Sequence, residues 1–321
     1  MGRLHAKAYA GAEGVRFVGV YDADPDAAAE TAEQFNTQPF TDLGALLAIT
    51  RAVSVATPTT THLAVAERAI GAGVACLIEK PLAIDVAQCR RIVELSKQHG
   101  VVVQVGHIER FNPVVRSMSQ LSIRPRFIEV IRISPLTFRS IDVGVVLDMM
   151  IHDIDIVLML AQSPVEQIDA VGVSVIGDAE DVCNARLRFA SGCVANLTVS
   201  RLALKTERRL RVFSEDAYVS LDFQKKYGIV ARKGENLAGI RDTVAKIRTG
   251  EIDDLSQINY ADLVHVEELQ INDTEPIRAE IASFVQAVRT GTRPVVSAED
   301  GLAAVELAMR IIDAIGVQKL D

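Results

Sequence analysis

The chain has 321 residues, 49% of them hydrophobic, which is enough to bury one or two substantial cores. Its formal net charge of -8 leaves no overall basic surface, which excludes nucleic acid and anionic membranes as main partners. The four cysteines lack the spacing of metal ligands, no apolar run could span a bilayer and no signal peptide opens the chain, so we expect a cytoplasmic protein with reduced thiols.

The first half of the chain alternates predicted helices and strands with short connections. Helices are expected at residues 1–11, 25–34, 43–49, 62–72 and 84–99, and strands at residues 15–21, 52–56, 75–79 and 101–105. This alternation predicts an α/β fold, a Rossmann-type doubly wound parallel sheet that can bind a nucleotide. We assign residues 1–122 to this dinucleotide-binding domain.

Asp22 follows the strand at residues 15–21. An acid at this place hydrogen-bonds a ribose diol and repels a 2'-phosphate, which favours NAD over NADP. The alternative is that Asp22 only forms an Asx turn in the sequence Asp-Ala-Asp-Pro.

The strand at residues 75–79 delivers Glu79, Lys80 and Pro81 to its carboxyl end. Ligands bind at that end of open parallel sheets. Lys80 would then be a cation at the crevice, able to polarise a substrate oxygen, while Pro81 turns the chain. The tripeptide alone fits equally well with a surface ion pair after an ordinary strand.

Residues 123–321 are predicted to form an α+β domain with a largely antiparallel sheet. A helix that starts at Asn112 and Pro113 ends near residue 121, and period-two alternation at 126–133 then begins the sheet. Further strands are expected at 167–175, 182–189, 194–201, 208–214, 219–223, 229–233 and 263–271, and helices at 145–160, 276–289 and 297–315, the last opened by a capping box. Residues 238–256 are weakly patterned and are expected to form an insertion or loop. One face of the sheet should pack on helices, which leaves the other free for a dimer interface.

Asp148 and His152 are four residues apart in the helix predicted at 145–160. They should share one helix face, with Cβ atoms about 6 Å apart. A neutral imidazole with an ordinary pKa of about 6.5 suits a general base. The alternative is an ion pair on the surface of the helix.

Five motifs in order along nearly the whole chain resemble the Gfo/Idh/MocA family of NAD(P)-dependent sugar and cyclitol oxidoreductases. They are Asp22, Thr57-Pro58 with His62, Glu79-Lys80-Pro81, Gly106 with Arg110-Phe111-Asn112-Pro113, and Asp148 with His152. The sequence Gly-His-Ile-Glu-Arg-Phe-Asn-Pro at 106–113 most resembles the corresponding segment in the branch of nucleotide-sugar 3-dehydrogenases that act on substrates such as UDP-N-acetylglucosamine.

The resemblance implies a role for each site residue. His152 would be the general base, Lys80 the polarising cation that also touches the cofactor ribose, and Asp148 the partner that orients the substrate or Lys80. The cofactor would be NAD, with NADP less favoured, and would be bound by Gly2, Arg3, Asp22, Thr57, Pro58, His62, Glu79 and Lys80. The substrate, a sugar or nucleotide sugar, would be bound by His107, Arg110 and Asn112, although Arg110 could instead pair with Glu109 or an acid of the second domain. The peptide bond between Lys80 and Pro81 should be cis.

The resemblance also implies a homodimer or homotetramer assembled through the second-domain sheet. We expect no metal site, because the six histidines form no metal-ligand cluster. Two other functions stay open: a free-sugar or inositol dehydrogenase, and a non-catalytic sugar or NAD sensor on the same fold.

The start of the sequence departs from the family pattern. The family opens with a strand and a Gly-x-Gly-x-x-Gly turn, of which only Gly2 is present. A sheet without that first strand leaves a gap between the strands at 15–21 and 52–56, where unpaired backbone groups would be costly. We therefore expect residues upstream of Met1 to supply the strand and the glycine turn.

Overall fold

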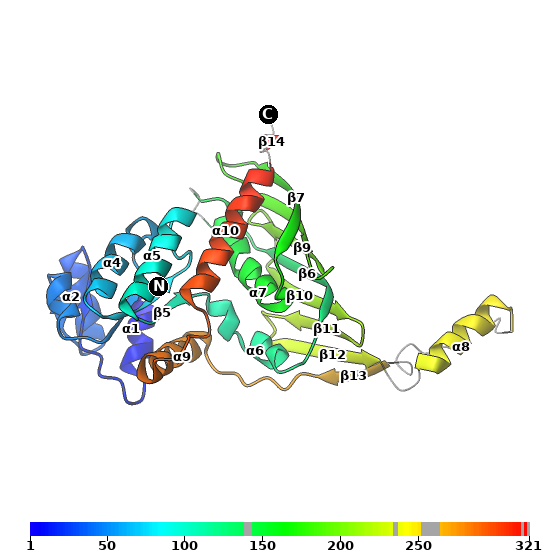
Figure 1. Ribbon diagram of the computed structural model, residues 1–321, viewed down its shortest axis with the longest axis horizontal. Coiled ribbons are helices and arrows are strands. Elements are labelled where there is room, and N and C mark those ends of the chain that lie inside the picture. The colour runs from blue at the N-terminus through cyan, green and yellow to red at the C-terminus, as the bar shows by residue number, and fades with distance from the viewer. Residues whose placement is uncertain (138–142, 234–236, 252–263, 316–317, 320–321) are drawn as a thin grey trace.

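A three-stranded parallel sheet forms the middle layer of the first domain (Figure 1). The computed structural model describes residues 1–137, 143–233, 237–251, 264–315 and 318–319 of the chain. The strands of this sheet run in the order β3 (Ala52–Val55), β4 (Ala75–Glu79) and β5 (Val103–Gly106). Every residue of β4 is buried, as expected for a parallel strand covered on both faces.

Alternate residues of β4 pack on opposite layers of helices, because successive side chains of a strand point to opposite faces. Cys76 and Ile78 belong to the large core with residues of α4 (His62–Gly71) and α5 (Val86–His99). Leu77 belongs to a smaller core with residues of α1 (Gly2–Ala10) and α9 (Pro276–Thr290). The doubly wound arrangement predicted from the sequence is therefore confirmed.

The strand predicted at residues 15–21 is wrong in its length. Only β1 (Val20–Tyr21) forms a ladder, parallel to β2 (Pro39–Phe40), a strand that was not predicted. Among the described residues no ladder joins β1 to β3, so the β1–β2 pair is separate from the three-stranded sheet. Residues 15–19 have strand-forming side chains, but strand structure requires a neighbouring backbone to pair with.

Side-chain caps place the helix starts where the sequence predicts them. Asp24 accepts the N–H of Asp26 at the start of α2 (Pro25–Gln34). Asp85 caps α5 in the same way, and Asp42 caps the short helix α3 (Leu43–Leu47). At the start of α10 (Ala298–Ile315), Ser297 N–H donates to Asp300 and Asp300 N–H donates to the Ser297 hydroxyl, which confirms the predicted capping box.

Nine strands form the sheet of the second domain, in the order β13-β12-β11-β10-β6-β9-β8-β7-β14. Neighbours are antiparallel except for the parallel pairs β6–β9 and β7–β14, so the predicted antiparallel character is confirmed. The strands are β6 (Pro125–Ile133), β7 (Val165–Ser174), β8 (Val182–Phe189), β9 (Val194–Ser200), β10 (Glu207–Ser214), β11 (Ala217–Asp222), β12 (Tyr227–Lys233), β13 (Val264–Glu268) and β14 (Gln318–Lys319).

Two helices, α7 (Ile151–Ala161) and α10, cover one face of this sheet (Figure 1). Every second residue of β8 and β9 is buried beneath them, while the residues between are partly or fully exposed. α10 also packs against α5 of the first domain. It therefore joins the two cores into one.

Residues 238–256, expected to form an insertion or loop, form an insertion with a helix where the structure describes them. These residues include most of α8 (Leu237–Arg248), which projects away from the second sheet (Figure 1). Apolar residues do recur at helical spacing, at Leu237, Ile240, Val244 and Ile247, but the polar residues between them obscure the pattern. Residues 252–256 lie outside the described part of the chain.

Helix α9 returns to the first domain although it lies far along the chain. It packs against α1 and against η2 (Ile108–Phe111), and its residues Ile277, Ile281 and Phe284 complete the core over Leu77. The division between residues 122 and 123 stays a prediction; it lies just before β6, and α9 crosses it to cover the sheet of the first part.

All four cysteines are buried and free. In the part of the chain that the structure describes, no helix combines the length and apolar character needed to cross a lipid bilayer.

Replacing Phe284 by Ala should show how far the first domain depends on α9. The side chain is fully buried, so its loss should lower the free energy of unfolding by about 3 to 5 kcal/mol. Phe213→Ala is the matched control, because Phe213 is 40% exposed and should lose less than half as much. Denaturant unfolding measures both variants, and equal losses would contradict the packing of α9 described above.

Candidate functional site

Lys80 and Asp148 meet between the two domains. Lys80 Nζ donates to the backbone carbonyl of Asp148 at 2.7 Å and to its Oδ1 at 3.3 Å. Both side chains keep some exposure, 20% for Lys80 and 34% for Asp148. The Lys80–Pro81 bond is cis, as predicted. The cation is therefore held from the second domain while its end stays open to a ligand.

Asp148 lies in a π-helical turn, η3 (Val146–Met150), which precedes α7. The expected continuous α-helix at residues 145–160 is therefore wrong at its start. In an α-helix the carbonyl of Asp148 would accept the N–H of His152, whereas a π turn uses the residue after it. Lys80 donates a hydrogen bond to this carbonyl, and π turns of this kind are common at functional sites.

His152, in the first turn of α7, lies beside His107, at the end of β5. The two rings are 6.3 Å apart between centroids and nearly perpendicular. Nδ1 of His152 and both ring nitrogens of His107 are buried without a hydrogen-bond partner among the described residues. Buried polar atoms in proteins are nearly always bonded, so these three nitrogens are candidates to meet a ligand.

Burial and charge keep both histidines neutral. Burial, and then Lys80, lower the pKa of His152 well below its usual 6.5. Burial also lowers the pKa of His107, and Asp155 opposes that change only in part. These rings bind protons more readily in the unfolded chain than in the fold. The free energy of unfolding therefore falls as the pH drops below about 6.5. The lowered pKa of His152 keeps its ring neutral at pH 7, which is the state that a general base requires.

Asp22 and Thr57 lie at the ends of β1 and β3, and both are exposed. Asp22 Oδ1 accepts the N–H of Asp24 at 3.0 Å, which is the Asx turn considered as an alternative. The second carboxylate oxygen stays available to a ribose, so the turn does not exclude that role. Pro58 is exposed beside Thr57, and its carbonyl accepts the hydroxyl of Thr61.

His62 has partners at both ring nitrogens. Nδ1 lies 3.0 Å from the carbonyl of Pro81, and Nε2 lies 3.0 Å from the carbonyl of Thr57. The ring is buried and joins the ends of β3 and β4. The ring thus links the two predicted cofactor loops, and its contact with the cofactor stays a prediction.

Gly2 and Arg3 open α1 on the surface. A Cβ on Gly2 would meet nothing within 4 Å, so no close approach of backbone is visible there. The guanidinium of Arg3 pairs with Glu30 in an exposed ion pair. Both residues are accessible to a cofactor, and Glu79 is instead buried and bonded to His5 at 2.7 Å.

Arg110 and Asn112 have protein partners in place of a free end for substrate. Arg110 binds both carboxylate oxygens of Asp155, at 2.6 and 2.7 Å, the ion pair with an acid of the second domain considered as an alternative. Asn112 caps α6 (Pro113–Ser119) through its oxygen, and its amide donates to Glu109. We interpret both as residues that hold η2 in place.

A buried ionic network beside the site was missed from the sequence. Arg132 on β6 binds both oxygens of Asp153 at 2.8 Å and Oε1 of Glu109 at 3.0 Å. Burial alone would lower the pKa of Arg132, but the two carboxylates raise it above its usual value. The only sequence signal was an arginine at an inward position of a strand, whose partners lie 21 and 23 residues away.

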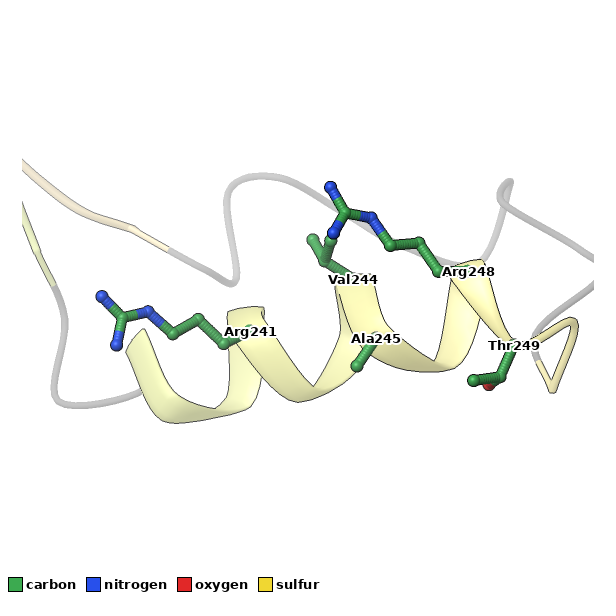
Figure 2. A pocket seen from close by; sticks show the side chains of 5 residues that line it. All are labelled: Arg241, Val244, Ala245, Arg248 and Thr249. Carbon is green, nitrogen blue, oxygen red and sulfur yellow. The ribbon is translucent and has the colours of Figure 1, made fainter.

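A surface hollow on α8 is remote from these residues. It is lined by Arg241, Val244, Ala245, Arg248 and Thr249 (Figure 2). All five lie on one projecting helix and its end, so the hollow adds nothing to the site between the domains.

Two models of known protein families match this chain. Residues 1–107 match the model of an oxidoreductase family with an NAD-binding Rossmann fold, and residues 135–220 match the GFO/IDH/MocA C-terminal domain. Together the matches cover more than half of the chain. The chain belongs to the Gfo/Idh/MocA oxidoreductase family. The resemblance seen in the sequence is thereby confirmed.

Relatives of this Gfo/Idh/MocA oxidoreductase include named dehydrogenases. This chain is 37% identical over 247 residues to UDP-N-acetylglucosamine 3-dehydrogenase from Acidithiobacillus ferrooxidans, and the match covers 75% of this chain and 78% of the relative. A solved structure of UDP-N-acetylglucosamine 3-dehydrogenase from the same organism matches with a TM-score of 0.87 at 32% identity, covering 98% of this chain and 94% of that one. Inositol 2-dehydrogenase from Rhizobium meliloti is 28% identical over 325 residues, covering 96% and 92%.

The coupling between Lys80 and His152 can be measured directly. Lys80→Met should raise the pKa of His152, because it removes the nearest lowering charge, yet burial should keep the value below 6.5. NMR titration of the His152 ring measures the shift. Lys205→Met, which changes an exposed lysine, should leave the value unchanged. An unchanged pKa in Lys80→Met would show that the two side chains do not interact.

Proposed function

We propose that this oxidoreductase transfers hydride between NAD and the C3 hydroxyl of a UDP-N-acetylhexosamine. The observation that carries the proposal is the convergence of Lys80, Asp148 and His152 between the two domains. The relative of known name that is 37% identical supports the choice of substrate. Both features are needed, since the same fold serves many substrates.

The three residues can carry the proton chemistry of alcohol oxidation. His152, neutral at pH 7, can accept the proton of the substrate hydroxyl. Lys80 can stabilise negative charge on the substrate oxygen, and Asp148 holds Lys80 through two of its oxygens. NAD, when bound, supplies the hydride acceptor.

The buried surroundings of the site favour this chemistry. The unpartnered nitrogens of His107 and His152 offer hydrogen bonds to a sugar hydroxyl where water is largely excluded. Electrostatic stabilisation is stronger in such a place than in water. We assign His107 to substrate binding on this basis.

The residues at the strand ends fit a dinucleotide. Asp22, Thr57 and Pro58 would lie along the adenosine half, and Lys80 would lie at the nicotinamide ribose. Gly106 faces Glu79 so closely that a Cβ would lie 3.1 Å from the Glu79 Cα, so β4 and β5 are in close contact beside Lys80. We propose NAD as the cofactor because Asp22 would repel the 2'-phosphate of NADP.

Two other functions differ in what they would bind. A free-sugar or inositol dehydrogenase is favoured by the near full-length likeness to an inositol 2-dehydrogenase. A sensor would bind sugar or NAD without turnover, and the retained Lys80, Asp148 and His152 argue against it. We also propose a cytoplasmic location, given four free thiols, and a homo-oligomer formed through the uncovered face of the second sheet.

The substrate is tested by measuring NAD reduction with a panel of UDP-N-acetylglucosamine, UDP-N-acetylgalactosamine, UDP-glucose, free N-acetylglucosamine and myo-inositol. The kcat/KM for the UDP-N-acetylhexosamines should exceed that for the free sugars and inositol. A preference for myo-inositol would support the alternative dehydrogenase, and binding without turnover would support the sensor.

His152→Ala should lower kcat roughly 100-fold or more and leave NAD affinity nearly unchanged, because the ring serves proton transfer. His265→Ala is the matched control, since that ring is exposed on β13. Steady-state kinetics and cofactor fluorescence titration separate the two effects. A parallel loss of NAD affinity would assign His152 a structural role.

Asp22→Ser should shift cofactor preference toward NADP by about tenfold or more, since one charge repulsion of about 1.4 kcal/mol is removed. Titration with NADH and NADPH measures the ratio of the two Kd values. Asp26→Ser, with the same charge change on the exposed start of α2, should leave the ratio unchanged. No change in either variant would place the ribose elsewhere.

A further inference from the structure

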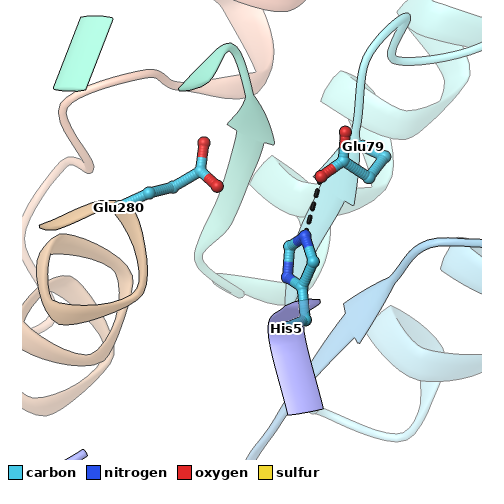
Figure 3. Close-up of side chains that lie close together, drawn as sticks. All are labelled: His5, Glu79 and Glu280. Carbon is cyan, nitrogen blue, oxygen red and sulfur yellow. Dashed lines mark hydrogen bonds and ion pairs between the residues drawn. The ribbon is translucent and has the colours of Figure 1, made fainter. Parts of the chain in front are cut away.

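Three buried side chains from distant parts of the chain converge beneath the site (Figure 3). His5 comes from α1, Glu79 from the end of β4 and Glu280 from α9. One nitrogen or oxygen atom of each lies within 4.8 Å of the others. None of the three is required by the proton chemistry proposed above.

Glu280 is the unusual member of this cluster. It is fully buried, and neither carboxylate oxygen has a hydrogen-bond partner among the described residues. Burial, and then the charge of Glu79, raise its pKa well above the usual value. A buried carboxyl group without a partner is costly whether or not it is charged, so a group that can bind both of its oxygens is expected beside it.

His5 has the surroundings of a metal ligand. Its Nε2 lies 2.7 Å from Glu79 Oε1, on the side of the cluster, and its Nδ1 lies 3.0 Å from the hydroxyl of Ser54. Tyr9 in turn lies 2.9 Å from the same hydroxyl. Histidines that bind metals usually have the second ring nitrogen held by an oxygen, which sets the ring orientation.

We propose that His5, Glu79 and Glu280 bind one divalent transition-metal ion, Zn²⁺ or Mn²⁺. One imidazole and two carboxylates are a common ligand set for such ions, and two carboxylates balance a charge of two. Ligands on opposite sides of an ion, each at about 2.0–2.2 Å, are at most ~4.4 Å apart. Neighbouring ligands of a tetrahedral ion lie ~3.4 Å apart, so His5 and Glu79 would separate from their 2.7 Å contact and Glu280 would turn toward them as the ion binds.

The ion would join α1 and α9 to the carboxyl end of β4. Glu79 directly precedes Lys80, so the ion would hold the backbone from which the catalytic cation extends. Its role is thus to position Lys80 and to stabilise the first domain. A shared proton or a buried water between Glu79 and Glu280 is the other way to satisfy Glu280, and the experiment separates it from a metal.

The test uses untagged, full-length protein and neither cofactor nor substrate, so its result is independent of the proposed function. Metal content is measured by mass spectrometry after purification. The protein is then stripped with dipicolinate, and thermal unfolding is followed with and without Zn²⁺ or Mn²⁺. We expect about one equivalent of metal, and a rise in Tm of about 5 °C or more when the preferred ion is restored.

Glu280→Gln should abolish both metal retention and the rise in Tm, because it removes one anionic ligand while keeping the shape. Glu275→Gln is the matched control, since Glu275 is exposed just before the same helix and should behave like the wild type. The wild-type measurements alone decide the matter if Glu280→Gln does not fold. Metal content below 0.1 equivalent with no response of Tm to either ion would overturn the proposal, and an undiminished response in folded Glu280→Gln would do the same.

Discussion

The buried guanidinium of Arg132 is the constraint on which the site depends. It joins β6, where it originates, to Asp153 on α7 and to Glu109 on η2. Removing one partner of such a pair typically costs about 3 to 5 kcal/mol, because the other charge is left buried. A second buried pair, Arg110 with Asp155, joins the same two elements. Helix α7 and the end of β5 therefore have one relative position.

This position determines the chemistry of the two histidines. His152 directly precedes Asp153, and His107 lies two residues before Glu109, so both rings are carried by elements that Arg132 holds together. The nearby acids bond to arginines, and within the described part of the chain no carboxylate is hydrogen-bonded to either ring. The histidines are consequently neutral, and the nearby Lys80 strengthens that preference in His152. A site that combines a lysine cation, held by Asp148, with a neutral base is suited to removing a proton from a hydroxyl group.

Local sequence patterns specify the order of the helices and strands and the strand ends at which the functional residues lie. Alternating helices and strands, the caps at Asp24, Asp85 and Ser297, and the motif Glu79-Lys80-Pro81 are local features, and local interactions produce them in the fold. The family resemblance can be recognised in the sequence because its motifs are short and follow strands. The pairing of Lys80 with Asp148, 68 residues apart, is implied by the family resemblance and not by a local pattern.

Which polar groups form hydrogen bonds and ion pairs with one another depends on how distant segments pack. Arg110 bonds to Asp155, 45 residues along the chain, and Asn112 bonds to Glu109, three residues earlier. The π turn at Asp148 and the short length of β1 depend on neighbouring parts of the backbone. The helix α8 has apolar residues at helical spacing, but the helix propensities of its residues do not reveal it. Glu280 reaches Glu79 only because α9 packs on the first sheet, 201 residues later in the chain. Such pairings arise from packing across sequence distance, and no local pattern encodes them.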